Sequence, residues 1–125
     1  MIEKNQLFIG LFLCQYLLDR TTSSCHSFKG EILLFLHHLF TLYLYFGSFF
    51  FGPKNHLILS LVVLIHWISY KRCILTIYTN QYCGVDIKRP FNDYIRMFGL
   101  HHIHKKIHWF LIIFVIMYDL FLIYK

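Results

Sequence analysis

Histidines grouped near the C-terminal end of this sequence have the spacing of a metal site. His101, His104 and His108 follow an i, i+3, i+7 pattern, which places three side chains on one face of a helix. Cys73 follows an apolar segment that we expect to end at the same membrane face. Imidazole nitrogens and thiolates are preferred ligands of transition metals. The pattern therefore predicts a metal site at His101, His104, His108 and Cys73.

Three more histidines lie inside apolar segments. By helical rise, His37 and His38 would lie about 8–9 Å below a membrane face, and His66 about 6 Å below the same face. Histidines on neighbouring helices of a bundle can ligate haem iron, and an intramembrane ionisable group marks a candidate site. His37 or His38 together with His66 is thus a candidate for binding a b-type haem.

The histidines also have a simpler interpretation. Each can be a polar residue near the lipid headgroups, hydrogen-bonded to a backbone carbonyl, a tyrosine or water. Lys105 and Lys106 would repel a cation bound beside them, and the sequence shows no carboxylate that would orient a ligating histidine. These points favour the interpretation without a cofactor, and both interpretations stay open at this stage.

Asp119 is the only carboxylate inside a predicted span, since Asp19 stands at the last residue of the first span. A carboxylate in the middle of a membrane helix costs about 3 kcal/mol and less near its ends. We expect Asp119 to reach the interface, or to pair with Lys54 or His56 at the same face. A role in a proton relay is the alternative.

The composition indicates a membrane protein. Charged residues make up 14% of the chain, against about 25% in soluble domains, while hydrophobic residues make up 58% and Ala is absent. A chain of 125 residues cannot bury that much apolar surface in water. Low charge and many aromatic residues exclude disorder. The expected fold class is an all-α integral membrane protein, an antiparallel bundle of three or four transmembrane helices with a short interfacial helix.

The gaps between charged residues define the predicted spans. The segments are residues 5–19, 32–52, 55–72 and 107–124, in one domain covering residues 1–125. The first is the shortest and has an alternative interpretation as a cleaved signal peptide over residues 5–18. The residues that precede it lack the net positive charge that is usual at the start of a signal peptide, so a retained helix is favoured.

Lys and Arg predict the orientation. Nine of them fall in the linker before the second span and in loop 71–106, and three fall on the other side. The positive-inside rule then places loop 71–106 in the cytoplasm and both termini outside. Basic residues there face anionic lipid headgroups, so the lipid bilayer is the expected partner and nucleic acid is not.

Loop 71–106 has two elements of its own. Residues 73–85 are uncharged and too short to span a membrane, which indicates an interfacial or re-entrant segment. Pro90 and Gly99 bound a stretch with apolar residues at helical spacing, which predicts the interfacial helix over residues 90–99.

The four cysteines are expected to be free thiols. Cys14 lies in an apolar segment, and Cys25, Cys73 and Cys83 fall on the predicted cytoplasmic side, where disulfides are rare. The sequence contains no CxxC pair.

One stretch resembles a known family. His56-Leu57 followed by CILTIYTN resembles small multi-pass bacterial membrane proteins classed as a domain of unknown function, which carry His-Leu and then C-P-L-T-x-x-E-N. Ile74 and Thr79 replace the Pro and the Glu. The similarity covers about residues 37–98 and implies a helical membrane fold without an activity. The matching residues are His37, His56, Cys73, Leu75, Thr76 and Asn80.

Three functions fit these patterns. The first is a non-enzymatic membrane protein with a structural or partner-binding role. The second is a haem- or metal-binding redox protein that uses the clustered histidines. The third is a small proton-linked transporter, which the lack of inverted repeats disfavours.

Overall fold

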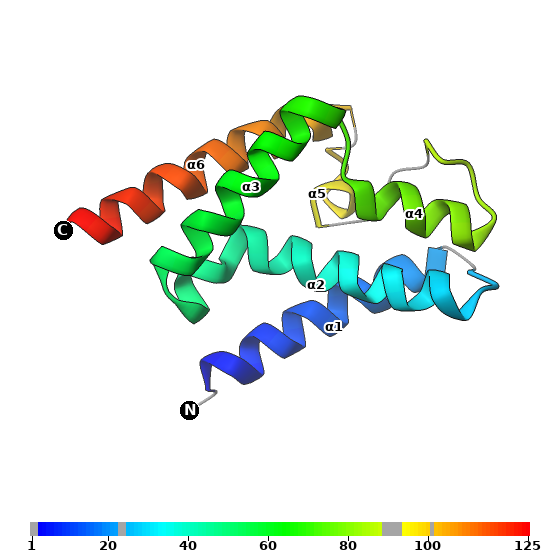
Figure 1. The fold of residues 1–125 in the computed structure, drawn as a ribbon. Coiled ribbons are helices and arrows are strands. Elements are labelled where there is room, and N and C mark those ends of the chain that lie inside the picture. The colour runs from blue at the N-terminus through cyan, green and yellow to red at the C-terminus, as the bar shows by residue number, and fades with distance from the viewer. Residues whose placement is uncertain (1–2, 23–24, 89–93, 101) are drawn as a thin grey trace.

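The computed structural model describes residues 3–22, 25–88, 94–100 and 102–125, and the regular structure within them is all helical. The expected all-α class is therefore confirmed. Figure 1 shows α1 and α2 side by side, α4 along the other side of α2, and α3 paired with α6. The helices are α1 (Lys4–Thr22), α2 (Phe28–Phe51), α3 (Pro53–Tyr70), α4 (Ile74–Cys83), the single turn α5 (Tyr94–Met97) and α6 (His104–Tyr124).

Helices α1 and α2 are antiparallel neighbours along their whole length. Near the start of α1, the ring of Phe8 lies 5.2 Å from that of Phe50 and 5.1 Å from that of Phe51. Near its end, Arg20 forms an ion pair of 2.9 Å with Glu31 in the first turn of α2. Aromatic rings fill this contact because the chain has no Ala and only six Gly to allow closer approach.

Helices α2, α3 and α6 enclose the second part of the core. Gly52 connects α2 to α3 with a φ of 99°, which glycine adopts readily, and Pro53 begins α3 at a position where its missing N–H is not needed. Helix α6 runs antiparallel to α3, with the rings of Trp67 and Trp109 6.0 Å apart at one end of the pair. The fully packed residues between the three helices are Leu44, Val63, Ile112 and Val115.

Helix α4 turns back from α3 and packs along α2. Helices α3 and α4 meet at a bend of 67°. At this bend Lys71 adopts a left-handed conformation with a φ of 56° and donates its backbone N–H to the carbonyl of Trp67. Gly84, with a φ of 68°, ends α4. This short helix occupies the uncharged stretch for which the sequence predicts an interfacial or re-entrant segment.

The segment around α5 lies against α1. The hydroxyl of Tyr94 donates a hydrogen bond of 2.6 Å to the carbonyl of Leu11. Burial raises the pKa of Tyr94 to about 12, so its hydroxyl stays protonated and keeps donating. The predicted interfacial helix over residues 90–99 is described only from Tyr94 onward, since residues 90–93 lie outside the described part of the chain.

The surface of the bundle is apolar and its interior is partly polar. Helices α2 and α6 are each long and apolar enough to cross a membrane, and the bent α3–α4 pair makes a third candidate. In these segments Ile58 is 63% exposed, Ile65 64% and Phe110 67%, while the side chain of Asp119 is fully buried. Soluble monomers rarely expose such continuous apolar surface, whereas a lipid environment favours it.

Candidate functional site

A cavity of about 460 Å³ opens between α2, α3, α6 and the first turn of α4. Its volume lies within the range of about 300–1,000 Å³ that is usual for small-molecule sites. We name it the histidine cleft, because His37 of α2, His66 of α3 and His108 of α6 all line it. Apolar side chains form much of the remaining wall, among them Phe40, Leu44, Val62, Val63, Trp67, Ile74, Leu75 and Trp109.

The three histidines of the cleft come from different helices and have different surroundings. His37 Nδ1 lies 4.0 Å from the Sγ of Cys73. The ring of His66 stacks on Tyr70 at 4.7 Å, and its buried Nε2 atom has no hydrogen-bond partner within the described residues. The ring of His108 meets the edge of Trp67 at 5.9 Å. These imidazoles therefore lie in a largely apolar site.

Four basic residues line the same cleft. They come from segments that meet at one end of the bundle: Lys71 and Arg72 follow α3, Lys88 follows α4, and Lys105 belongs to the first turn of α6. No Asp or Glu of the described chain is among the lining residues. The cleft thus combines apolar walls with a cationic end.

His38 does not belong to the cleft, although the sequence groups it with His37 and His66. Its ring is fully buried against α1, where Nε2 lies 2.9 Å from Oδ2 of Asp19 and Nδ1 lies 2.9 Å from the side-chain nitrogen of Gln15. The amide nitrogen donates, so Nδ1 accepts and the Nε2–H donates to the carboxylate. The expectation that no carboxylate supports a histidine is therefore wrong for His38.

His56 and Asp119 form a second buried pair, between α3 and α6. Nε2 of His56 lies 2.8 Å from the carbonyl oxygen of Leu44, which can only accept, so this nitrogen carries a proton. Nδ1 lies 2.6 Å from Oδ2 of Asp119. Two bare acceptors would repel at that distance, so one further proton lies between them and the pair has no net charge. The hydroxyl of Ser48 donates to Oδ1 of the same carboxylate.

This pair confirms one of the expected partners of Asp119. The sequence predicts that Asp119 reaches the interface or pairs with Lys54 or His56, and the structure shows the pairing with His56. Both side chains are fully buried, and together with Ser48 they connect α2, α3 and α6. The arrangement neutralises a carboxylate inside an apolar bundle, which stabilises the helix contacts.

The predicted metal site is only partly described. His108 and Cys73 both line the histidine cleft, but residue 101 and the side chain of His104 lie outside the described part of the chain. Among the described residues, no three His, Cys, Asp or Glu side chains come close enough together to hold a metal ion.

The residues of the family pattern divide among three places. His37, Cys73, Leu75 and Thr76 line the histidine cleft. Asn80 is buried further along α4 and donates to the carbonyl of Ile87 at 3.2 Å, which holds the segment that follows the helix. His56 belongs to the buried pair with Asp119.

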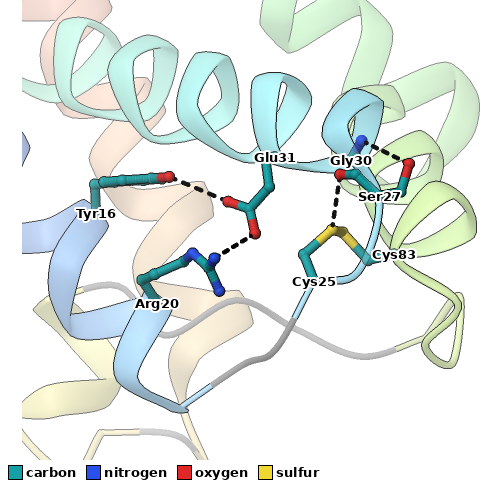
Figure 2. Close-up of a disulfide and its surroundings, with 7 residues drawn as sticks. All are labelled: Tyr16, Arg20, Cys25, Ser27, Gly30, Glu31 and Cys83. Atoms are coloured by element: carbon teal, nitrogen blue, oxygen red, sulfur yellow. Dashed lines mark hydrogen bonds and ion pairs between the residues drawn. A yellow bond between two sulfur atoms is a disulfide. The ribbon is translucent and has the colours of Figure 1, made fainter.

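The prediction of four free thiols is wrong for two of them. Cys25 and Cys83 form a disulfide, whereas Cys14 and Cys73 are free. The prediction was based on the compartment and on the absence of a CxxC pair, and it did not anticipate that α4 folds back along α2. That packing brings the last residue of α4 beside the first turn of α2, as Figure 2 shows.

Sequence reasoning also missed the role of α1. Phe8, Phe12, Gln15 and Asp19 are all buried and lie on one face of the helix at spacings of three and four residues. The two polar members of this face are the partners of His38. Their spacing of four residues is a signal that could have indicated a polar contact with a neighbouring helix.

No protein-family model, curated protein or solved structure matches this chain. The histidine cleft and the two buried His–Asp pairs are therefore the features that can support a function.

Proposed function

We propose that this chain is a multi-pass membrane protein whose role is binding and not catalysis, and that its histidine cleft binds an amphipathic anion. Such a ligand has an apolar body and a carboxylate or phosphate group. The observation that carries the proposal is the composition of the cleft, which has apolar walls, four basic residues at one end and no acidic residue among the described lining.

The apolar body of the ligand would lie against Leu44, Val63, Trp67 and Trp109. Val62 also lines the cleft and is 57% exposed on a face of α3 that carries other exposed apolar side chains. This position gives the cleft an opening toward the lipid, so the ligand can enter from the bilayer. Burial of apolar surface contributes about 25 cal/mol per Å² to such binding.

The anionic group would lie at the basic end. One guanidinium nitrogen of Arg72 donates to the carbonyl of Ile87 at 3.0 Å, and the remaining N–H groups can donate to a carboxylate or phosphate. The ammonium groups of Lys71, Lys88 and Lys105 add positive charge. Near the membrane surface these charges are only partly screened, so a charged ligand is favoured over its neutral ester.

The topology that fits this proposal has four spans. Helix α1 has 19 residues, about 28 Å by helical rise, and runs beside α2 from one end to the other. It buries Gln15 and Asp19 against α2 and exposes Leu7, Ile9, Leu13 and Leu17, the arrangement that lipid favours. The excess of Lys and Arg then places loop 71–106 in the cytoplasm and both termini outside.

Haem is a second candidate ligand, and one observation favours it. His66 presents a buried Nε2 without a hydrogen-bond partner in the described chain, in the same cleft as His37 and His108. A b-type haem is itself an amphipathic anion with an apolar ring and two carboxylates. One or two of these imidazoles would ligate its iron, and the basic residues would hold its carboxylates.

The two tryptophans of the chain make the proposal testable. Trp67 and Trp109 both line the cleft, so their fluorescence reports its occupancy. The full-length protein in phosphatidylcholine nanodiscs is titrated with 9,10-dibromostearate, whose bromines quench tryptophan. We expect saturable quenching at one equivalent, and at least tenfold weaker quenching by the methyl ester. Equal quenching by acid and ester, or quenching without saturation, contradicts the proposal.

Further titrations of the same protein identify the source of the anion. A dibrominated phosphatidic acid tests a lipid phosphate, and inorganic phosphate as competitor tests a free one. Arg72→Gln should weaken the quenching by dibromostearate at least fivefold, while Lys125→Gln, which removes a charge at the far end of α6, should not change it. Haemin is added separately: a Soret band typical of histidine ligation, lost in His66→Ala, assigns the cleft to haem.

A further inference from the structure

The disulfide joins two segments that are far apart in the sequence. Cys25 precedes α2, Cys83 is the last residue of α4, and 58 positions separate them. Figure 2 shows the bond beside the first turn of α2, next to Gly30 and Ser27. The bond therefore fixes the C-terminal end of α4 to the N-terminal end of α2.

Gly30 provides the space that the two sulfur atoms occupy. A Cβ atom at this position would lie 2.5 Å from the Sγ of Cys25 and 2.6 Å from the Sγ of Cys83. It would also lie 3.2 Å from the backbone nitrogen of Cys83. A side chain at position 30 would therefore displace the two sulfur atoms or the end of α4, so the close packing at the disulfide depends on glycine.

The other end of α4 forms part of the histidine cleft. Ile74, Leu75 and Thr76, in its first turn, line the cleft together with Cys73. That end is attached to α3 only through the left-handed turn at Lys71 and the 67° bend. We call α4 the strap, because its first turn forms part of the cleft wall, its length packs along α2, and its last residue is held by the disulfide.

We propose that Cys25 and Cys83 form a reversible redox site that controls ligand binding in the histidine cleft, an inference that rests on the proposed function. The oxidised pair holds α4 on α2 and keeps the wall of the cleft in place. The reduced pair releases one end of the strap, and the wall loosens. The predicted cytoplasmic position of both cysteines exposes them to glutathione, and disulfides in that compartment are usually transient and regulatory.

The proposed chemistry is thiol–disulfide exchange with glutathione disulfide. One cysteine thiolate attacks a sulfur of glutathione disulfide, whose S–S bond breaks and releases one glutathione thiolate. The second cysteine thiolate attacks the protein sulfur of the mixed disulfide, forming the Cys25–Cys83 bond and releasing the second glutathione thiolate. The cysteines lose two electrons and two protons, which glutathione disulfide gains.

The test compares dibromostearate binding by the full-length protein in glutathione and in glutathione disulfide. We expect at least fivefold tighter binding in the oxidised form, reversed on reduction. Cys83→Ser should bind as the reduced form does in both buffers, and Cys14→Ser, which changes a free thiol, should keep the response. Equal affinity in the two buffers overturns the redox proposal and leaves the proposed function intact.

Hydrogen exchange separates the two proposals if no probe binds. Absence of binding in both buffers contradicts the proposed function. The redox proposal is then tested by hydrogen exchange at the backbone amides of residues 74–83. Their exchange should become at least tenfold faster on reduction in the wild type, and reduction should not change it in Cys83→Ser. Exchange that is unaffected by reduction overturns the redox proposal by itself.

Discussion

His56 of α3 and Asp119 of α6 share a proton across a contact of 2.6 Å, and both side chains are fully buried. His38 and Asp19 form a similar contact of 2.9 Å between α2 and α1. In each case α2 or α3, the two helices joined at Gly52, supplies the histidine, and α1 or α6 supplies the aspartate. The interior polar groups of the bundle are therefore used to attach α1 and α6 to the α2–α3 pair.

Removing one member of the His56–Asp119 pair should destabilise the protein strongly. Asp119→Leu or His56→Leu leaves the other side chain buried and uncompensated, which costs about 3–5 kcal/mol of unfolding free energy. The double variant removes both polar groups and should be no less stable than either single variant. Unfolding in mixed micelles with increasing denaturing detergent measures these values. Glu3→Leu is the exposed control and should change the stability by less than about 0.5 kcal/mol. Additive effects of the two single substitutions would show that the pair is not coupled.

Gly47 should be required for the position of His56. A Cβ atom at residue 47 would lie 2.5 Å from Cδ2 of His56 and 3.2 Å from its Nε2, which donates to Leu44. Gly47→Ala should therefore lower the unfolding free energy by about 1–3 kcal/mol through overpacking. Gly10→Ala meets no atom within 4 Å and should raise it by about 0.5–1 kcal/mol, because alanine favours the helix. A smaller loss for Gly47→Ala in the His56→Leu background identifies His56 as the group displaced.

The helices and the position of the cleft could be predicted largely from local sequence. The apolar segments between charges predict α2, α3 and α6, since a membrane span must satisfy its backbone internally. Depth by helical rise placed His37, His66 and Cys73 at one level, and the structure shows them lining one cavity. This worked because depth depends only on the distance along a helix.

The orientation of side chains around each helix could not be predicted in the same way. His37 and His38 have almost the same depth, but their side chains leave α2 about 100° apart, so one lines the cleft and the other contacts α1. The disulfide was missed for a related reason. It depends on the turn at Lys71 and on Gly30, two features whose meaning appears only when α4 is placed on α2.

The neighbouring residues His37 and His38 should give opposite phenotypes. His37→Ala alters the lining of the histidine cleft and should weaken dibromostearate binding by a factor of about 2–5, with little loss of stability. His38→Ala leaves Asp19 and Gln15 buried without this partner and should lower the unfolding free energy by about 1–3 kcal/mol, with unchanged affinity in the folded fraction. The two measurements are tryptophan quenching and unfolding in mixed micelles. The same phenotype for both variants would contradict the separation of the histidine cleft from the buried His38–Asp19 pair.

Lys71 should be strained by its conformation and also favour anion binding. Its φ of 56° is adopted at low cost only by glycine, so Lys71→Gly should raise the unfolding free energy by about 1 kcal/mol. Lys71→Ala keeps a Cβ atom and should not. Both substitutions remove the same charge from the cleft, so both should weaken dibromostearate binding to the same extent. A gain in stability for alanine equal to that for glycine would show that the backbone conformation is not the cause.

The predicted orientation gives a labelling result that does not depend on any ligand. Lys54 lies in the first turn of α3 and Asp86 in the segment after α4, and both are exposed. In a Cys14→Ser, Cys73→Ser background, Lys54→Cys should react with a membrane-impermeant maleimide on intact cells, since this end of the bundle is predicted to face outward. Asp86→Cys should react only after permeabilisation, because the excess of Lys and Arg predicts a cytoplasmic position for its side of the bundle. Peptide mapping distinguishes these labels from any on Cys25 and Cys83. Labelling of residue 86 on intact cells would show that the orientation is the opposite of the predicted one. The disulfide would then lie in an oxidising compartment, where it would be permanent.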